Sequence, residues 1–420
     1  MKYRQWIKVL SWTLLVATLG AFVHFCLPRD LDRFGSYGMR RIARKLHIPV
    51  PAHKPLTSAE HSAARAEAAA WKVKFLAEFP ALEVTERPVP AEENGFLLLY
   101  QLGSALPISE EFKKILADRN GWDPETVKRC LAEHAEVVGK IEHIAALPTR
   151  SSANMPADYI GFINAIPGIN GSRMLLLKAR LAAEAGDEEE TLRLLSAAGN
   201  LGFHYHDIEA PSFLCETIAV LVNRAIEDLS FKTLLPALGK SAHLNRWKSL
   251  FGRKIYSAAE LAKMMRGEWN NGADFMAFPL LAVSEKTCEM PDAEETLRCY
   301  SAIYSQCVSD LPSRSLADLM NYKIVCPGGV SHLSEEGRGI IDTISTGDES
   351  WFQGYVQAAA VHQQHQAALD LLILEKAGTT LTPADANRIT REPVSGLPFV
   401  FDAVSRKLSA PKLDPLTLPW

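Results

Sequence analysis

A run of 19 residues without Lys, Arg, Asp or Glu, from Val9 to Leu27, constrains this chain more than any other feature of its sequence. At about 1.5 Å per residue, a helix of that length matches the hydrocarbon core of a bilayer. A cleaved signal peptide is the alternative, but the stretches ATLGA and FVHFC fit the small-residue requirement of a cleavage site poorly. The sequence therefore predicts residues 1–28 as a cytoplasmic tail and an uncleaved transmembrane anchor.

The charges on either side of this run bear on its orientation. Three Lys or Arg residues precede it and six follow it within about 20 residues, which taken literally favours the C-terminal side inside the cell. Against this, a short tail with three cations is a poor candidate for export, and long C-terminal domains translocate largely regardless of charge. We expect a single-pass protein of the inner (cytoplasmic) membrane with its large domain outside the cytoplasm.

The composition is that of a globular protein, with 47% hydrophobic and 22% charged residues. The net charge is −4, and the one basic concentration, Arg40 to Lys45, follows the apolar run. That position suits lipid headgroups, and no broad basic field exists to hold a phosphate backbone. We expect the membrane and a protein of unknown identity as partners, and no nucleic acid.

Seven cysteines leave two interpretations open. Cys26 lies in the anchor, and six others follow it: Cys130, Cys215, Cys288, Cys299, Cys307 and Cys326. They suit disulfides in an oxidising compartment, or they are buried as small apolar residues. Cys299 and Cys307 lie eight residues apart on one predicted helix, about 12 Å along its axis, so they cannot bond each other.

The remaining chain divides by composition and pattern. Residues 29–56 are rich in Pro, Gly, His and basic residues and are predicted to form a stalk or linker. Capping residues and amphipathic spacing then predict a helical subdomain over 57–170, a helical body over 171–377, and a C-terminal loop with a β-hairpin over 378–420. The fold class is predicted to be all-α, an irregular multi-helix bundle behind a transmembrane helix.

The clearest element of the body is an αα-hairpin. In the stretch RMLLLKARLAAEAGDEEETLRLLSAAGNLG, Gly186 ends one amphipathic helix and Asp187 caps the next, with Glu190 completing a capping box. The pattern resembles a tetratricopeptide hairpin, but no second copy follows at a 34-residue period.

A long helix is predicted from Asp348 or Glu349 to Lys376, with Gly378 ending it. We expect its polar insert, residues 362–366, at the solvent or at a partner surface. The run that follows, with Phe399 and Phe401, predicts a two-stranded hairpin packed on that helix.

The C-terminal pattern Glu392-Pro393-x-x-Gly396-x-Pro398-Phe399, after a long helix, resembles pseudopilin-like modules. Together with the hairpin region 171–229, it also resembles uncharacterised membrane-anchored helical proteins of planctomycete and verrucomicrobial bacteria. The resemblance implies an anchored helical architecture. The anchor lacks the Gly-Phe-Thr-Leu-Ile-Glu opening of a prepilin, and Glu392 stands where Asp is more usual.

Two groups of residues are candidate metal ligands. His362 and His365 share one helical face, but Gln363 stands where a zinc-protease helix carries its glutamate. His204, His206 and Asp207 form a His-x-His-Asp cluster, but no matching set of ligands follows downstream, and the favoured interpretation is that Asp207 caps the next helix.

A nucleophilic site is the third possibility, with Cys326 near His332 and the acids Glu335 and Glu336. Pro327 to Gly329 more simply describe a tight loop. The stretch Met264 to Phe275, rich in amides, is expected to be a turn between helices that could line a groove.

These patterns assign no residue as catalytic, cofactor-binding or metal-binding, and no cofactor is expected. The favoured function is a non-catalytic scaffold or protein-interaction role in the cell envelope, because helical hairpins bury one face and leave another for a partner. The alternative is an envelope hydrolase with a His-based metal site.

Overall fold

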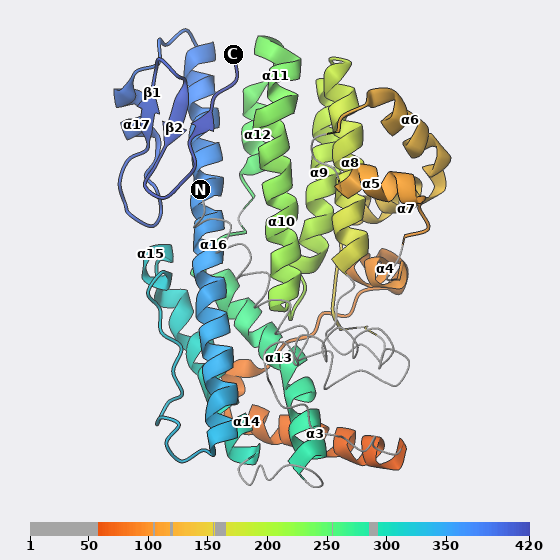
Figure 1. Cartoon of the computed structure of the whole chain (residues 1–420), viewed down its shortest axis with the longest axis vertical. Helices are drawn as coiled ribbons and strands as arrows, with labels where there is room; N and C mark the ends of the chain where they lie inside the picture. The colour runs from red at the N-terminus through yellow and green to blue at the C-terminus, as the bar shows by residue number, and fades with distance from the viewer. Residues whose placement is uncertain are drawn as a thin grey trace, which may run out of the picture. The chain divides into compact units, whose positions relative to one another are not determined.

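The computed structural model describes residues 58–103, 106–117, 121–153, 155, 165–253, 255–284 and 293–420 (Figure 1). The predicted anchor, 9–27, and the predicted stalk, 29–56, lie outside the described residues. Within the described ranges, no helix is both long enough and apolar enough to span a bilayer.

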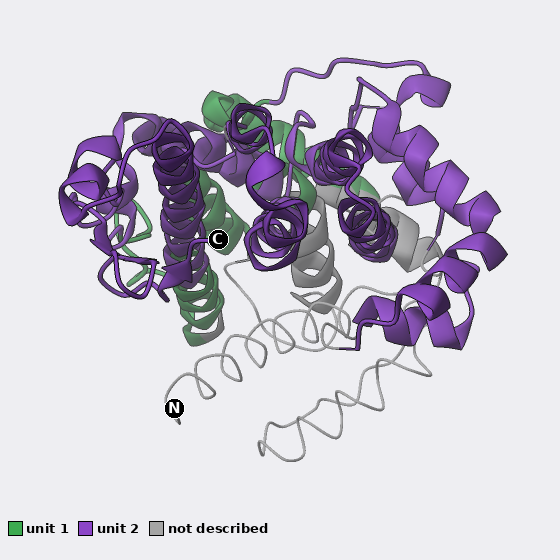
Figure 2. Ribbon diagram, turned by 90° about the horizontal axis from the view of Figure 1, so that it is seen from above, with its two compact units in different colours: residues 1–83, 269–306, 323–349 green, residues 84–268, 307–322, 350–420 purple. Residues whose placement is uncertain are grey.

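The chain divides into two compact units, each assembled from separate segments (Figure 2). Unit 1 takes residues 1–83, 269–306 and 323–349, and unit 2 takes residues 84–268, 307–322 and 350–420. Each unit is described by itself below.

Unit 1 is built mainly from helical segments. They are α3 (Ser58–Glu78), η1 (Pro80–Leu82), the C-terminal part of α13 (Ala258–Ser284), most of α14 (Ala293–Asp310) and the N-terminal part of α16 (Glu335–Lys376). A disulfide joins Cys299 on α14 to Cys326. The indole of Trp269 is buried and donates to Ser301 Oγ over 2.9 Å, which ties α13 to α14.

Unit 2 contains most of the helices and the sheet. Its elements are η2 (Ala91–Glu93), α4 (Gly95–Gln101), α5 (Glu110–Ala117), α6 (Pro124–Glu133), α7 (Ala135–Ala146), α8 (Ala165–Glu184), α9 (Glu188–His206), α10 (Phe213–Leu229), η3 (Ser230–Leu234), α11 (Leu235–Leu238), η4 (Gly239–Ser241), α12 (Leu244–Phe251), η5 (Leu311–Ser313), α15 (Leu316–Leu319), α17 (Pro383–Ile389) and the remaining parts of α13, α14 and α16. Its main hydrophobic core draws on α8, α9, α10, α12 and the C-terminal part of α16.

Helices α8 and α9 form the αα-hairpin that the sequence predicts (Figure 1). Gly186 adopts a φ of 78° in the connecting turn, a conformation that glycine reaches without strain. Asp187 caps α9 by accepting a hydrogen bond from the amide of Glu190 over 2.9 Å. The Glu190 side chain bonds Arg193 and not the cap, so the predicted capping box is only half present.

Two helices run further than predicted. Helix α16 begins at Glu335 and has 42 residues. It continues through Gly337, Gly339 and Gly347, which precede the predicted start at Asp348. Asp348 is not its N-cap; the carboxylate is buried and accepts a hydrogen bond from Tyr304 over 2.9 Å. Helix α13 continues through the stretch 264–275, so the turn expected there is wrong.

The polar insert of α16 is buried, and its expected place at the solvent or at a partner surface is wrong. His362, Gln364 and His365 are all buried. Gln364 donates to the carbonyls of Leu408 (2.8 Å) and Asp414 (3.1 Å), so the insert hydrogen-bonds the C-terminal segment. These side chains are buried because each finds polar partners inside the unit.

The chain is mostly helical, with a small antiparallel sheet at its C-terminus. Strands β1 (Val400–Asp402) and β2 (Lys407–Ser409) form the predicted hairpin, with Phe401 opposite Leu408. A third strand, β3 (Leu416–Thr417), pairs with β2 and was not predicted, because two residues are too few to show an alternating pattern. Phe399 and Phe401 are buried in the main core together with residues of α16, as expected.

Candidate functional site: a buried histidine–carboxylate network

The sequence candidates on α9 point to separate partners. His204 is fully buried, and its Nε2–H donates to the carbonyl oxygen of Ile144 over 2.8 Å. Burial lowers its pKa to about 4, so the ring is neutral at pH 7. A Cβ on Gly95 would lie within 2.5 Å of this imidazole, which shows how tightly the ring packs against α4.

His206 is the centre of a buried ionic contact. Its Nδ1 donates to Glu216 on α10 over 2.7 Å, and its Nε2 lies 3.6 Å from a carboxylate oxygen of Glu260 on α13. Burial opposes the charged imidazole, but the charge and the hydrogen bond of Glu216 outweigh it and raise the pKa of His206. This histidine therefore links α9, α10 and α13 through charge.

Asp207 faces a different way. Arg150 donates to it over 2.7 Å, and Lys263 lies 3.6 Å away. Burial opposes ionisation, but Arg150 holds the pKa of Asp207 below its usual value. The expectation that Asp207 caps the next helix is wrong, since Ser212 caps α10 by accepting from the amide of Cys215.

The two histidines of α16 do converge, on a single carboxylate. His362 Nδ1 donates to Glu227 on α10, and His365 Nδ1 lies 3.5 Å from the second oxygen of the same residue. Asn223 also donates to Glu227 over 2.8 Å, and Gln366 donates to His362 Nε2 over 2.9 Å. Both nitrogens of His362 are therefore engaged, and a bound ion would have to displace one of these contacts.

Two tyrosines extend the aromatic contacts of His362. The ring of Tyr256 lies 5.3 Å from His362 and 5.4 Å from Tyr355, centroid to centroid. The Tyr355 hydroxyl donates to the carbonyl of Ile255 over 2.7 Å. Burial raises the pKa of both tyrosines well above 10, and the charge of Glu216 adds to this at Tyr355. Both hydroxyls therefore stay protonated as hydrogen-bond donors.

Sequence reasoning missed the two carboxylates on which this network depends. Glu216 and Glu227 lie 11 residues apart on α10, about three turns, so they share the face that carries Ala219 and Val222. Acidic residues on the apolar face of an amphipathic helix indicate buried partners, because a buried charge needs one. The signal was present, but the partners on α9 and α16 are far away in sequence.

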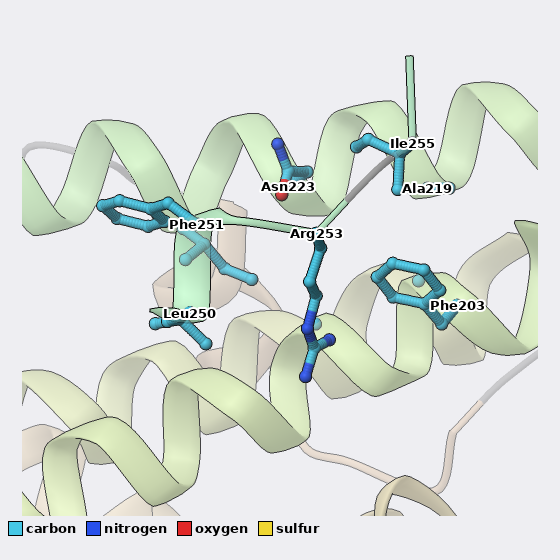
Figure 3. Close-up of a pocket in the computed structure, with 10 residues that line it drawn as sticks. Phe203, Ala219, Asn223, Leu250, Phe251, Arg253 and Ile255 are labelled. Carbon is cyan, nitrogen blue, oxygen red and sulfur yellow. The ribbon is translucent and has the colours of Figure 1, made fainter. Parts of the chain in front are cut away.

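A small pocket adjoins the network in unit 2. It lies between α9, α10 and the end of α12 and encloses about 350 Å³ of empty space, its opening to solvent included (Figure 3). Asn223 and Arg253 are the polar side chains in its lining, and Phe203 is one of the aromatic ones. Asn223 therefore contacts both the pocket and the Glu227 cluster.

The candidate ligands and nucleophile do not assemble as the sequence suggested. In the described part of the chain, no three His, Cys, Asp or Glu side chains are grouped so as to hold a metal ion. The prediction of Cys326 as a nucleophile is wrong, because its sulfur forms a disulfide with Cys299. Cys130, Cys215 and Cys307 are buried and are not part of the Cys299–Cys326 disulfide, so both interpretations of the cysteines hold in part.

Comparison of the chain with models of protein families, with curated proteins and with solved structures gives no match.

Proposed function

We propose that this protein is a membrane-anchored, non-catalytic component of the cell envelope whose helical body serves as a scaffold for a protein partner. The proposal rests on one observation: side chains that could act in catalysis are bound to other residues of the same protein. His206 is held by Glu216, His362 by Glu227, and Cys326 by Cys299. A general base or nucleophile must instead reach a substrate in a cleft.

The C-terminal sheet offers a surface for such a partner. Leu397, Val400 and Val404 are aliphatic side chains that are 52%, 59% and 97% exposed. Single exposed aliphatics are common, but three within eight residues favour a contact surface. Arg406, in the turn between β1 and β2, forms two hydrogen bonds of 2.8 Å to Glu375 on α16. This ion pair fixes the sheet to α16 and so fixes the position of its exposed loops.

Photo-crosslinking of the full-length chain in its membrane tests the scaffold role. A benzophenone amino acid in place of Val404 should yield a crosslinked product of discrete mass. Glu136, with a side chain 83% exposed on α7, is the matched control position and should yield none. The same pattern at both positions, or no product at Val404, would count against the proposal.

The envelope location rests on the uncharged run 9–27, which we propose as a transmembrane helix preceding the helical bundle. Alkaline phosphatase fused after Pro411 should be active if the large domain lies outside the cytoplasm. An inactive fusion, together with an active cytoplasmic reporter at the same site, would reverse the topology.

A further inference from the structure

Arg253 is a half-buried positive charge, and no carboxylate of the described residues is paired with it. Its Nη2 donates to Ser196 Oγ over 3.0 Å, while its Nη1 is buried and has no hydrogen-bond partner. Buried hydrogen-bond donors in proteins are normally paired, so the unpaired Nη1 of this cation is an exception that an acceptor from outside the chain would remove.

The surroundings of Arg253 destabilise its charged guanidinium, so a bound anion would be stabilising there. Its guanidinium lies 5.0 Å from the ring centroid of Phe203, and that of Arg150 lies 5.9 Å from the same ring. Burial lowers the pKa of Arg253, and the charge of Arg150 acts in the same direction. The carboxylate of Asp207 accepts a hydrogen bond from Arg150 and lies 3.6 Å from Lys263, so its charge is already paired.

Helix α9 is shaped to admit the guanidinium. A Cβ on Gly199 would lie 2.7 Å from Arg253 Nη1, so a larger residue there would displace the guanidinium from its present position. Gly202, one turn further on, would bring a Cβ within 3.3 Å of Val222 on α10. Glycine is among the poorest helix formers, and two within one buried helix indicate that close approach is needed here.

The pocket around Arg253 is small. Figure 3 shows Arg253 extending between α9 and the segment after α12, with Phe203 beside it. The enclosed space has room for about one water molecule, and the pocket opens to solvent on one side. Such a space favours a compact anion over a phosphate ester or a bulky sulfonate.

We propose that Arg253, over the ring of Phe203, is a binding site for a compact monovalent anion: chloride, or a single carboxylate group of a ligand. The anion would accept a charge-assisted hydrogen bond from Nη1. This site lies outside the scaffold role proposed above and does not depend on it.

Thermal unfolding of the full-length protein in detergent tests the site. Sodium chloride and sodium acetate, as separate arms, are compared with sodium isethionate at equal ionic strength. A bound anion at ten times its dissociation constant shifts the folding equilibrium about elevenfold. We expect a saturable rise in Tm with chloride, acetate or both, and none with isethionate; equal Tm values in all three salts would overturn the proposal.

Arg253→Met removes the charge and keeps most of the side-chain length, so the anion-dependent rise should disappear. Arg246→Met is the control, because Arg246 is exposed and already paired with Glu189 at 3.0 Å. Retention of the full rise in Arg253→Met would refute the site. If that variant does not fold, the chloride-35 line width of sodium chloride with the wild-type protein decides. We expect broadening that added sodium acetate reverses and added sodium isethionate does not. No broadening, or equal reversal by both salts, would refute the proposal.

Discussion

Replacing Glu227 by Gln should destabilise unit 2 far more than the loss of an ordinary ion pair. The Glu227 side chain is 1% exposed and is contacted by His362, His365 and Asn223. Gln keeps the shape but turns one acceptor oxygen into a donor, which then faces another donor. Hydrogen bonds to a charged group contribute about 1.5–3 kcal/mol each, and breaking a buried pair costs about 3–5 kcal/mol.

We therefore expect Glu227→Gln to lower the free energy of unfolding by about 3 kcal/mol. Glu190→Gln is the matched control, because Glu190 pairs with Arg193 at 2.6 Å but the two side chains are 36% and 50% exposed. That change should cost no more than about 1 kcal/mol. Urea denaturation of the full-length protein in detergent at pH 7, followed by tryptophan fluorescence, measures both.

A double-mutant cycle sharpens this test. Glu227→Gln and His362→Gln remove the two sides of one contact, so their combined cost should fall short of the sum by about 1–3 kcal/mol. Additive costs would show that the two residues do not interact. A Glu227→Gln variant no less stable than the Glu190→Gln control would refute the reasoning altogether.

Three further outcomes follow from the structure. The pKa of His204 is about 4 in the folded state and 6.5 in the unfolded state, so between these values the unfolded state binds more protons. The free energy of unfolding should therefore fall by about 3 kcal/mol as the pH drops from 6.5 to 4. The difference between the urea midpoints at pH 4.5 and pH 7 should be smaller in His204→Gln than in the wild type. Ala368→Pro, in the buried part of α16, should lower the free energy of unfolding by about 3 kcal/mol or more and expose residues 390–411 to limited proteolysis. The control Ala368→Gly should lower it by about 1 kcal/mol. An unchanged cleavage pattern in the proline variant would be incompatible with the helix. Cys326→Ser should cost about 3.5 kcal/mol by opening the disulfide to Cys299, a sequence separation of 27, and a reductant should destabilise the wild type but not the variant.

Local signals made much of the fold predictable. The Gly186–Asp187 turn, the helix end before Gly378 and the alternation around Phe401 each act within a few residues. Capping and turn chemistry of this kind is written in adjacent positions, so it can be read without tertiary information.

The candidate site was not predictable in the same way. The sequence identified His206, His362 and His365 as chemically notable, but their partners Glu216 and Glu227 are assigned only when α9, α10 and α16 pack together. A row of polar residues in mid-helix suggests a solvated face, and only tertiary contacts decide whether it is one.

The same reason explains the two underestimated helices. Asp348 has the chemistry of an N-cap, yet Tyr304, 44 residues earlier, takes up its carboxylate. In the stretch 264–275, amide residues suggest a turn, but buried Trp269 and its bond to Ser301 hold the helix through it. Packing outweighs local propensity in both cases.

The metal content of the full-length protein tests the central claim most directly. The claim is that His204, His206, Asp207, His362 and His365 hold helices together through internal partners. The purified protein is incubated with equimolar zinc, dialysed and assayed by plasma mass spectrometry, alongside the His204→Gln/His206→Gln double variant. The account predicts far less than one zinc per chain, equal in both proteins; one zinc per chain in the wild type, lost in the variant, would contradict it and support the hydrolase alternative.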